Sequence, residues 1–254
     1  MLILLPPSEG KAEGTGARAK PGALAFAPAL SAPRKEVLDA LVRVSGGPKA
    51  KALSTLGLSA SMAAMLERNV GLAKAPASPA IEVYTGVLFE ALDWDGLSAK
   101  AQKRGAESLL ISSALFGVVR PLDPIPAYRL SMDVTLPKVG GLAAFWKPHL
   151  NRAVADVVTH LVIDARSSTY AASWTPPSES TYAVKVMTEK AGKRTVVSHM
   201  AKHSRGVLAG LLLSAAKMPR TIDEVANIAA AHFKVEVSSP SGRNSGVLTL
   251  ITHG

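Results

Sequence analysis

The chain contains no cysteine, and this absence removes a whole group of chemistries. Without thiols it can form no disulfide, no thiolate nucleophile, no zinc–thiolate site and no cysteine-ligated iron–sulfur cluster. Its six histidines also lack the spacing of two histidines with a carboxylate that would predict a metal site. We therefore expect neither a metal nor another cofactor, and any redox role of the chain has to work without thiols.

Long apolar runs and acidic residues are scarce as well. Every apolar run is interrupted by a charge or a proline well before the roughly 18 residues that a membrane span needs, which favours a soluble, cytoplasmic protein with no membrane partner. The 29 lysines and arginines outnumber 19 acidic residues, so the formal net charge is +10. Residues 81–150 carry seven residues of each sign, and the excess lies in the two flanks. Such a charge favours polyanionic partners.

The order of apolar and polar segments predicts an α+β fold in one domain spanning residues 1–254. Three apolar runs, at residues 1–5, 109–113 and 160–165, are typical of buried strands. Two hairpins are expected from residues 182–198 and 233–252. Helical patterns cover the following ranges: 31–44, 49–73 as two short helices, 87–92, 142–158, 200–217 and 221–231. This mixture predicts a mixed β-sheet covered by helices, with a basic cleft.

Proline and glycine suggest where several of these segments begin and end. Glu9–Pro33, rich in glycine, alanine and proline, indicates a long loop, after which Ser31 is expected to cap a helix that stops at Gly46. Pro148 is expected to divide the helical stretch 142–158 into two pieces.

The segment Ser113–Ser131 concentrates polar groups in a rigid stretch. It holds Arg120, Asp123, Tyr128 and Arg129 beside one glycine and three prolines. Because each proline fixes φ and restricts the residue before it, neither a regular helix nor a central strand can run through the segment. Two guanidinium groups and a phenol on a stiff loop indicate a preorganised site for an anionic or planar partner. Alternatively, the segment is a structural crossover whose arginines cap helix ends or pair with Asp123.

Six motifs, in one order along the chain, carry a family resemblance. They are Met1–Lys11, Val83–Gly86, Ser113–Ser131, Phe145–Trp146, Ile163–Tyr170 and Ser198–Gly206. With these motifs the chain resembles the YaaA family of bacterial peroxide-stress proteins over nearly its whole length. The resemblance implies a cytoplasmic protein that helps cells to survive hydrogen peroxide, limits damage from intracellular iron and, in at least one member, binds DNA. It implies no established small-molecule reaction.

Polar loops follow the three apolar strands, and this places the candidate site. In open α/β sheets the loops at the carboxyl ends of parallel strands gather into one crevice, so these loops converge if the strands are parallel neighbours. The helix expected after Ser198 adds a basic face at its amino terminus. The candidate ligand-binding or DNA-binding residues are Ser8, Lys11, Tyr84, Arg120, Tyr128, Arg129, Asp164, Arg166, His199, Lys202 and Arg205. Each also has a plain structural interpretation, such as a solvated lysine, a half-buried histidine or a packed tyrosine.

Two functions remain open from the sequence. The first is binding of double-stranded or distorted DNA with little sequence preference. The family resemblance implies a helix-hairpin-helix-like element, and its counterpart here, residues 52–65, retains Gly57 but lacks a second hairpin glycine; alternatively, this stretch is simply a packed pair of helices. The second is an enzyme or binding protein for a small phosphorylated or nucleobase-like ligand, with Asp164 or His199 moving a proton. The two are compatible, because a base extruded from a duplex could enter such a pocket. The sequence leaves open whether any reaction is catalysed.

Overall fold

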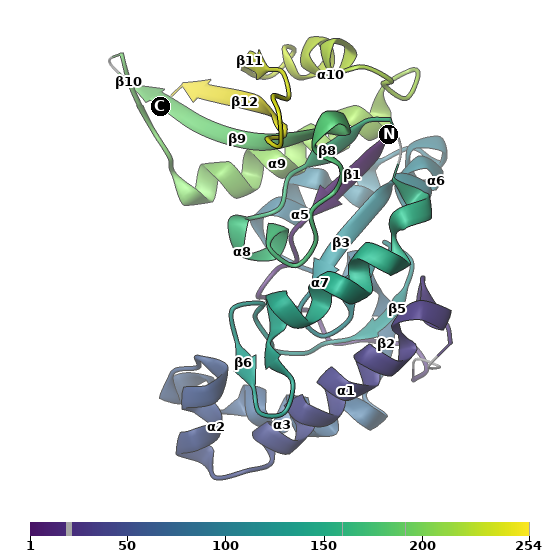
Figure 1. Ribbon diagram of the computed structural model, residues 1–254, viewed down its shortest axis with the longest axis vertical. Helices are drawn as coiled ribbons and strands as arrows, with labels where there is room; N and C mark the ends of the chain where they lie inside the picture. Colours follow the sequence, from purple (N-terminus) through teal and green to yellow (C-terminus); the bar gives the residue numbers. More distant parts are fainter. Residues whose placement is uncertain (19–21, 159, 191, 254) are drawn as a thin grey trace.

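A mixed sheet of eight strands forms the centre of the protein in the computed structural model, which describes residues 1–18, 22–158, 160–190 and 192–253 (Figure 1). Its spatial order is β11 (Lys234–Ser238), β12 (Gly246–His253), β9 (Thr181–Lys190), β8 (Val162–Asp164), β1 (Leu2–Leu5), β3 (Leu109–Ser113) and β4 (Gly117–Val119), and β10 (Lys193–Thr195) pairs with β9. Neighbours from β12 to β3 are parallel, whereas β4, β10 and β11 join antiparallel. The expected α+β class with a mixed sheet is confirmed.

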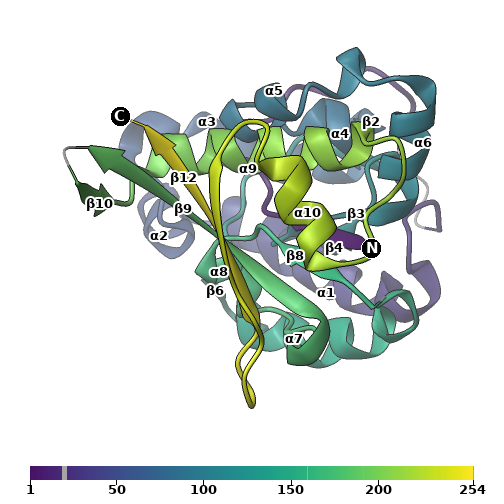
Figure 2. The same ribbon diagram turned by 90° about the horizontal axis from the view of Figure 1, so that it is seen from above.

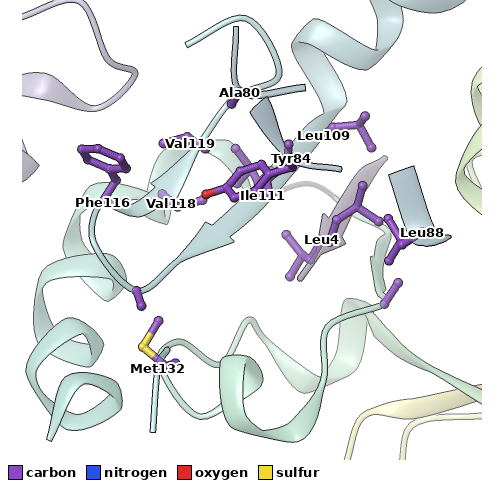
Figure 3. Close-up of a cluster of buried hydrophobic side chains, with 14 of the residues drawn as sticks. Leu4, Ala80, Tyr84, Leu88, Leu109, Ile111, Phe116, Val118, Val119 and Met132 are labelled. Carbon is purple, nitrogen blue, oxygen red and sulfur yellow. The ribbon is translucent and has the colours of Figure 1, made fainter. Parts of the chain in front are cut away.

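The three apolar runs become adjacent parallel strands, as the site argument requires. Ile3 of β1 lies opposite Leu109 of β3 on one side and Ile163 of β8 on the other. All residues of these three strands are buried, because helices cover both faces of the sheet at this point. Figure 3 shows Leu4, Leu109 and their neighbours in the resulting core.

Helices lie on both sides of the sheet (Figure 2). α5 (Val87–Leu92) and α9 (Ser198–Ser214) pack against each other on one face, and α7 (Leu142–Ala153) lies on the other. The remaining α-helices are α1 (Ala27–Ser45), α2 (Lys49–Leu56), α3 (Ala64–Val70), α4 (Ala80–Val83), α6 (Ala99–Ser108), α8 (Ser168–Ala171) and α10 (Ile222–Ala229). Across the described ranges, no helix combines the length and apolar character needed to cross a bilayer.

Two expected helix boundaries are wrong. α1 begins at Ala27, because the preceding residue, Phe26, has a left-handed backbone conformation that cannot belong to the helix. Ser31 therefore lies inside the helix, where its hydroxyl donates to the Ala27 carbonyl. The loop predicted for Glu9–Pro33 is therefore shorter. α7 runs through Pro148 without a break. Pro148 lies on the exposed side, where water can satisfy the carbonyl it leaves free, while buried Trp146 anchors the opposite side.

The proline-rich segment Ser113–Ser131 contains only short strands at sheet edges. It includes edge strand β4 and then β5 (Pro124–Pro126), which pairs with β2 (Ala77–Pro79) in a separate two-stranded sheet. A second small sheet joins β6 (Thr135–Leu136) to β7 (Gly140–Gly141). Prolines are tolerated in such positions because an edge strand leaves one row of N–H groups unused. The expectation that no helix or central strand crosses the segment is confirmed.

Candidate functional site

A cavity of about 370 Å³ lies beyond the carboxyl ends of β1 and β8. Its walls come from the loop after β1, the turn that starts α5, the loop after β5, the segment around α8 and the first turns of α9. The lining residues include Ser8, Glu9, Lys11, Thr85, Gly86, Arg129, Ser131, Ser167, Tyr170, Lys202 and Arg205. Five segments that are far apart in sequence thus meet at one end of the parallel strands, where open α/β sheets commonly bind ligands.

Lys11 is held over two buried tyrosine rings. Its ammonium lies 4.3 Å from the ring centroid of Tyr128 and 5.2 Å from that of Tyr84, and it donates a 2.7 Å hydrogen bond to the Ser8 carbonyl. An isolated antiparallel β-bridge pairs the backbones of Lys11 and Tyr84, and the Ala12 N–H donates a hydrogen bond to the Val83 carbonyl. These contacts fix the backbone at Lys11. Desolvation and then the positive charge of Arg129 lower the pKa of Lys11 to about 7.

The two tyrosines beneath Lys11 belong to a buried chain of hydroxyl groups. The Tyr84 and Tyr128 hydroxyls are 3.0 Å apart, and the Ser113 hydroxyl lies 2.7 Å from that of Tyr128. Ser113 also accepts from the Phe116 backbone N–H. Burial raises the pKa of both tyrosines, so the phenols remain neutral and their rings present π faces to the ammonium.

Arg129 is positioned by a clamp on its backbone. The amide of buried Asn69, on α3, accepts a hydrogen bond from the Arg129 N–H and donates one to the Arg129 carbonyl. The Arg129 guanidinium forms a 3.1 Å ion pair with Glu9, whose side chain is 78% exposed. Because water solvates the exposed Glu9 carboxylate and weakens the pair, an anionic ligand can compete with Glu9 for this guanidinium.

α9 contributes two further cations. Lys202 is exposed and, among the described residues, has no hydrogen-bond or ion-pair partner. Arg205, one helical turn later, makes only a long 3.4 Å contact to the Val184 carbonyl, and its Nε is buried without a partner. Desolvation lowers the pKa of Arg205, with Asp164 acting in the opposite direction. A buried guanidinium nitrogen without an acceptor is costly, and an anion in the cavity would satisfy it.

The expectation that Arg120 shares this cleft is wrong. Its guanidinium donates to the carbonyls of Ala106 and Glu107, at 3.2 and 2.6 Å, where α6 ends and β3 begins. The reason is topological: β4 returns antiparallel to β3 and carries Arg120 back to the amino end of the parallel strands. Arg120 thus caps a helix end, as the alternative interpretation of this segment had it, and Asp123 accepts from the Arg120 backbone N–H.

Asp164 and Arg166 are engaged with each other. Arg166 donates through Nε and one terminal nitrogen to the two Asp164 oxygens, at 2.8 and 2.7 Å, and also to the Trp174 carbonyl. Both side chains are buried. This buried, hydrogen-bonded pair stabilises the loop after β8, so neither residue is a free ligand group in this structure.

Of the two remaining predicted residues, one lines the cavity and the other does not. Ser8 lines the cavity, and its hydroxyl donates to the Gly10 carbonyl, which shapes the loop that carries Lys11. His199 is exposed on the first turn of α9 and does not belong to the residues that line the cavity.

Sequence reasoning missed Glu9, Asn69 and Ser113 as parts of the site. Asn69 lies near the end of the short helix α3 with no motif around it, and Ser113 is an ordinary strand-end serine. Glu9, in contrast, lies within the motif Met1–Lys11, and its place beside Lys11 was a usable signal.

Comparison with known proteins shows the family. The model for "Peroxide stress protein YaaA" matches residues 1–238. This chain belongs to the YaaA family. It is 41% identical to a UPF0246 protein of Streptomyces coelicolor over 260 aligned residues, covering 100% of this chain and 99% of the relative. A UPF0246 protein of Corynebacterium glutamicum is 38% identical over 99% of this chain and all of its own length. An uncharacterized protein of Campylobacter jejuni is 36% identical over 54% of each chain.

Membership of the YaaA family agrees with the resemblance drawn from the motifs. It associates the chain with peroxide stress, but it names no ligand, reaction or partner. The residues of the cavity therefore have to supply the molecular hypothesis.

Proposed function

We propose that this YaaA-family protein binds DNA through the cavity at the carboxyl ends of β1 and β8, and that it does so in the cytoplasm as part of peroxide-stress resistance. One observation carries the proposal: Lys11, Arg129, Lys202 and Arg205 reach the same cavity from three separate parts of the chain. Glu9 is the one acidic residue in the part of the lining that the structure describes. Such a concentration of cations fits a polyanion whose phosphates displace Glu9 from Arg129.

The binding is expected to have little sequence preference. The four cations are suited to phosphates, and phosphate contacts position a nucleic acid without reading its bases. The helix-hairpin-helix-like stretch adds weak support: α2 and α3 are separated by a turn at left-handed Gly57, but Arg68 beside it is already paired with Glu13. The cavity therefore carries the proposal, and that stretch does not.

Salt dependence tests the proposal directly. If Arg129, Lys202 and Arg205 contact phosphates together with Lys11 in its ammonium form, log K for duplex DNA should fall against log salt with a slope of about −3.6, and for single strands with a slope of about −2.8. Lys202→Ala and Arg205→Ala should each reduce the steepness by about 1 and weaken binding to all sequences alike. Fluorescence anisotropy with a random duplex, a single strand and a duplex containing an unpaired bubble gives these slopes.

Lys103→Ala is the matched control for those variants. It removes the same charge from an exposed site on α6, which leads into the amino end of β3, away from the cavity. If Lys103→Ala and Lys202→Ala reduce the steepness of the salt dependence equally, DNA binding depends only on the net charge of the protein. Absence of binding by the unmodified protein at micromolar concentration and about 50 mM salt would reject the DNA proposal.

A second candidate function is capture of a small phosphorylated or nucleobase-like molecule. The specific observation is the size of the cavity, about 370 Å³, which falls within the usual range for small-ligand pockets. Titration calorimetry with a nucleoside monophosphate separates the two functions. Tight binding of the monomer with no preference for a DNA strand would favour the small ligand.

A further inference from the structure

Lys11 differs from Arg129, Lys202 and Arg205 because its charged group lies over two aromatic rings. Arg129 is paired with Glu9 and Arg68 with Glu13, whereas the Lys11 ammonium contacts a carbonyl oxygen and two aromatic rings. Arg129 and Arg68 repel its positive charge, and Glu9 only partly offsets them. The ammonium form of Lys11 is thus disfavoured where a bound ligand would lie.

Such an environment is what converts a lysine into a nucleophile. An amine attacks a carbonyl carbon only in its neutral form, and enzymes obtain that form by desolvating a lysine or by placing it next to another cation. Both conditions hold at Lys11. The buried Tyr84 and Tyr128 beneath it keep water from one side, and the Ser8 carbonyl fixes where the amine points.

We propose that Lys11 is a catalytic residue that forms an imine with the aldehyde of a phosphorylated sugar, while Arg129, Lys202 and Arg205 hold the phosphate. The proposal rests on the proposed function in one respect: within DNA, such an aldehyde occurs at an abasic site, where the sugar that has lost its base opens to an aldehyde flanked by phosphates. A free sugar phosphate presents the same two groups. The cavity has room for one sugar with its phosphate.

The step balances without any further reactant. The lone pair of neutral Lys11 Nζ adds to the aldehyde carbon, and one of the two Nζ protons is transferred to the carbonyl oxygen to give a carbinolamine. The second Nζ proton is transferred to the same oxygen, which leaves as water, and a carbon–nitrogen double bond replaces the carbon–oxygen double bond. One aldehyde and one amine thus become one imine and one water, with no oxidation or reduction.

Borohydride trapping tests this step. Hydride adds to the imine carbon and leaves a secondary amine that survives denaturation, so a covalent adduct reports the intermediate. The full-length protein is incubated with borohydride and one of three substrates: a duplex with a single abasic site, an otherwise identical intact duplex, or free 2-deoxyribose 5-phosphate. Peptide mass mapping then locates the adduct. We expect the abasic duplex to be trapped on Lys11 and the intact duplex to give no adduct.

Three variants control the trapping experiment. Lys11→Arg keeps a cation but removes the nucleophile, Lys11→Met keeps the packing over the tyrosines, and Lys103→Arg alters an exposed lysine on α6. The two Lys11 variants should lose at least about 100-fold in adduct yield, the scale of a lost covalent step, whereas Lys103→Arg should match the unmodified protein. If both Lys11 variants prove unstable, the mass map of the unmodified protein still decides.

The outcomes separate this inference from the DNA proposal. Trapping of the free sugar phosphate on Lys11, without binding or trapping of DNA, would support the imine and reject the DNA proposal. Salt-dependent DNA binding with no adduct from either aldehyde would overturn the imine and leave DNA binding in place. Adducts spread over other amines of the chain would also overturn it.

Discussion

At the β4 edge of the sheet, arginine side chains donate their hydrogen bonds to backbone carbonyls. At the cavity, cationic side chains remain available to bind a ligand. Arg34 donates to the carbonyls of Val118 in edge strand β4, of Phe116 just before that strand, and of Ala25. Arg120 nearby binds the last carbonyls of α6. Lys202 and Arg205 have no comparable acceptors among the described residues. The surroundings of a cation, and not its residue type, thus separate a structural group from a candidate ligand group.

The edge region shows what such arginines contribute to the fold. An uncovered edge strand offers unpaired carbonyls to other chains, and the buried Arg34 guanidinium on α1 occupies the Val118 carbonyl of β4 and the adjacent Phe116 carbonyl from within the molecule. Burial lowers the pKa of Arg34 to about 10, so the group stays charged at neutral pH and keeps its donors. In the cavity, burial is offset less, because Lys11 and Arg205 each have one carbonyl acceptor where Arg34 has three.

The largest expected effect is a pH-dependent stability difference between the protein and its Lys11→Met variant. Lys11 has a pKa of about 7 when folded and 10.5 when unfolded, so between these values the unfolded chain binds one more proton. Unfolding free energy should therefore rise with pH over this window, relative to Lys11→Met, by up to about 1.4 kcal/mol per pH unit. Solvent access to the half-buried side chain keeps the slope below that limit. Urea unfolding at several pH values measures it.

In that experiment the unmodified protein should be the less stable of the two at pH 7, with the gap closing toward alkaline pH. The groups facing Lys11 are Arg129, Glu9, Arg68 and the two tyrosines, and all of them remain in the variant. A gap that does not change with pH would mean that the Lys11 ammonium is well solvated, and the contrast between the two regions would lose its main support.

Arg34→Met should show the opposite sign. It removes the guanidinium donor from three carbonyl oxygens, although the Phe116 oxygen keeps its hydrogen bond from the Val118 N–H, so we expect a loss of about 3 kcal/mol in unfolding free energy and no change in the salt slope of DNA binding. The neighbouring Lys35→Met is the control, since Lys35 forms only an exposed pair with Asp39 and should cost under about 0.5 kcal/mol. Equal losses in both variants would contradict a structural role for Arg34.

Arg120→Ala is expected to have the smallest effect. Its two hydrogen bonds lie at a partly exposed helix end, so their loss should cost about 1 kcal/mol of stability. DNA affinity and its salt slope should stay unchanged, whereas Arg129→Ala should reduce the steepness by about 1. Weaker DNA binding by Arg120→Ala at unchanged stability would contradict this prediction and show that Arg120 belongs to the DNA-binding surface.

Much of the fold was accessible from the sequence because it depends on local pattern. The apolar runs that became β1 and β3 are bounded by proline and by polar residues, and burial on both faces leaves no other place for them. Their parallel adjacency then predicts that Lys11 and Arg129 meet at one end, as they do. Helix starts were less certain, since prolines suit both a loop and a first helical turn, and this explains the misplaced start of α1.

The sequence by itself determined the sheet class, the excess of cations and the absence of thiol chemistry, because these follow from composition and local pattern. Tertiary structure alone decided which cations are free. The partners of Arg34 and Arg120 are backbone carbonyls of distant segments, and every residue has such a carbonyl, so no sequence pattern marks them. The same holds for the Asn69 clamp on Arg129 and the tyrosine pair under Lys11, whose members lie 60 and 44 residues apart and meet only when the sheet closes.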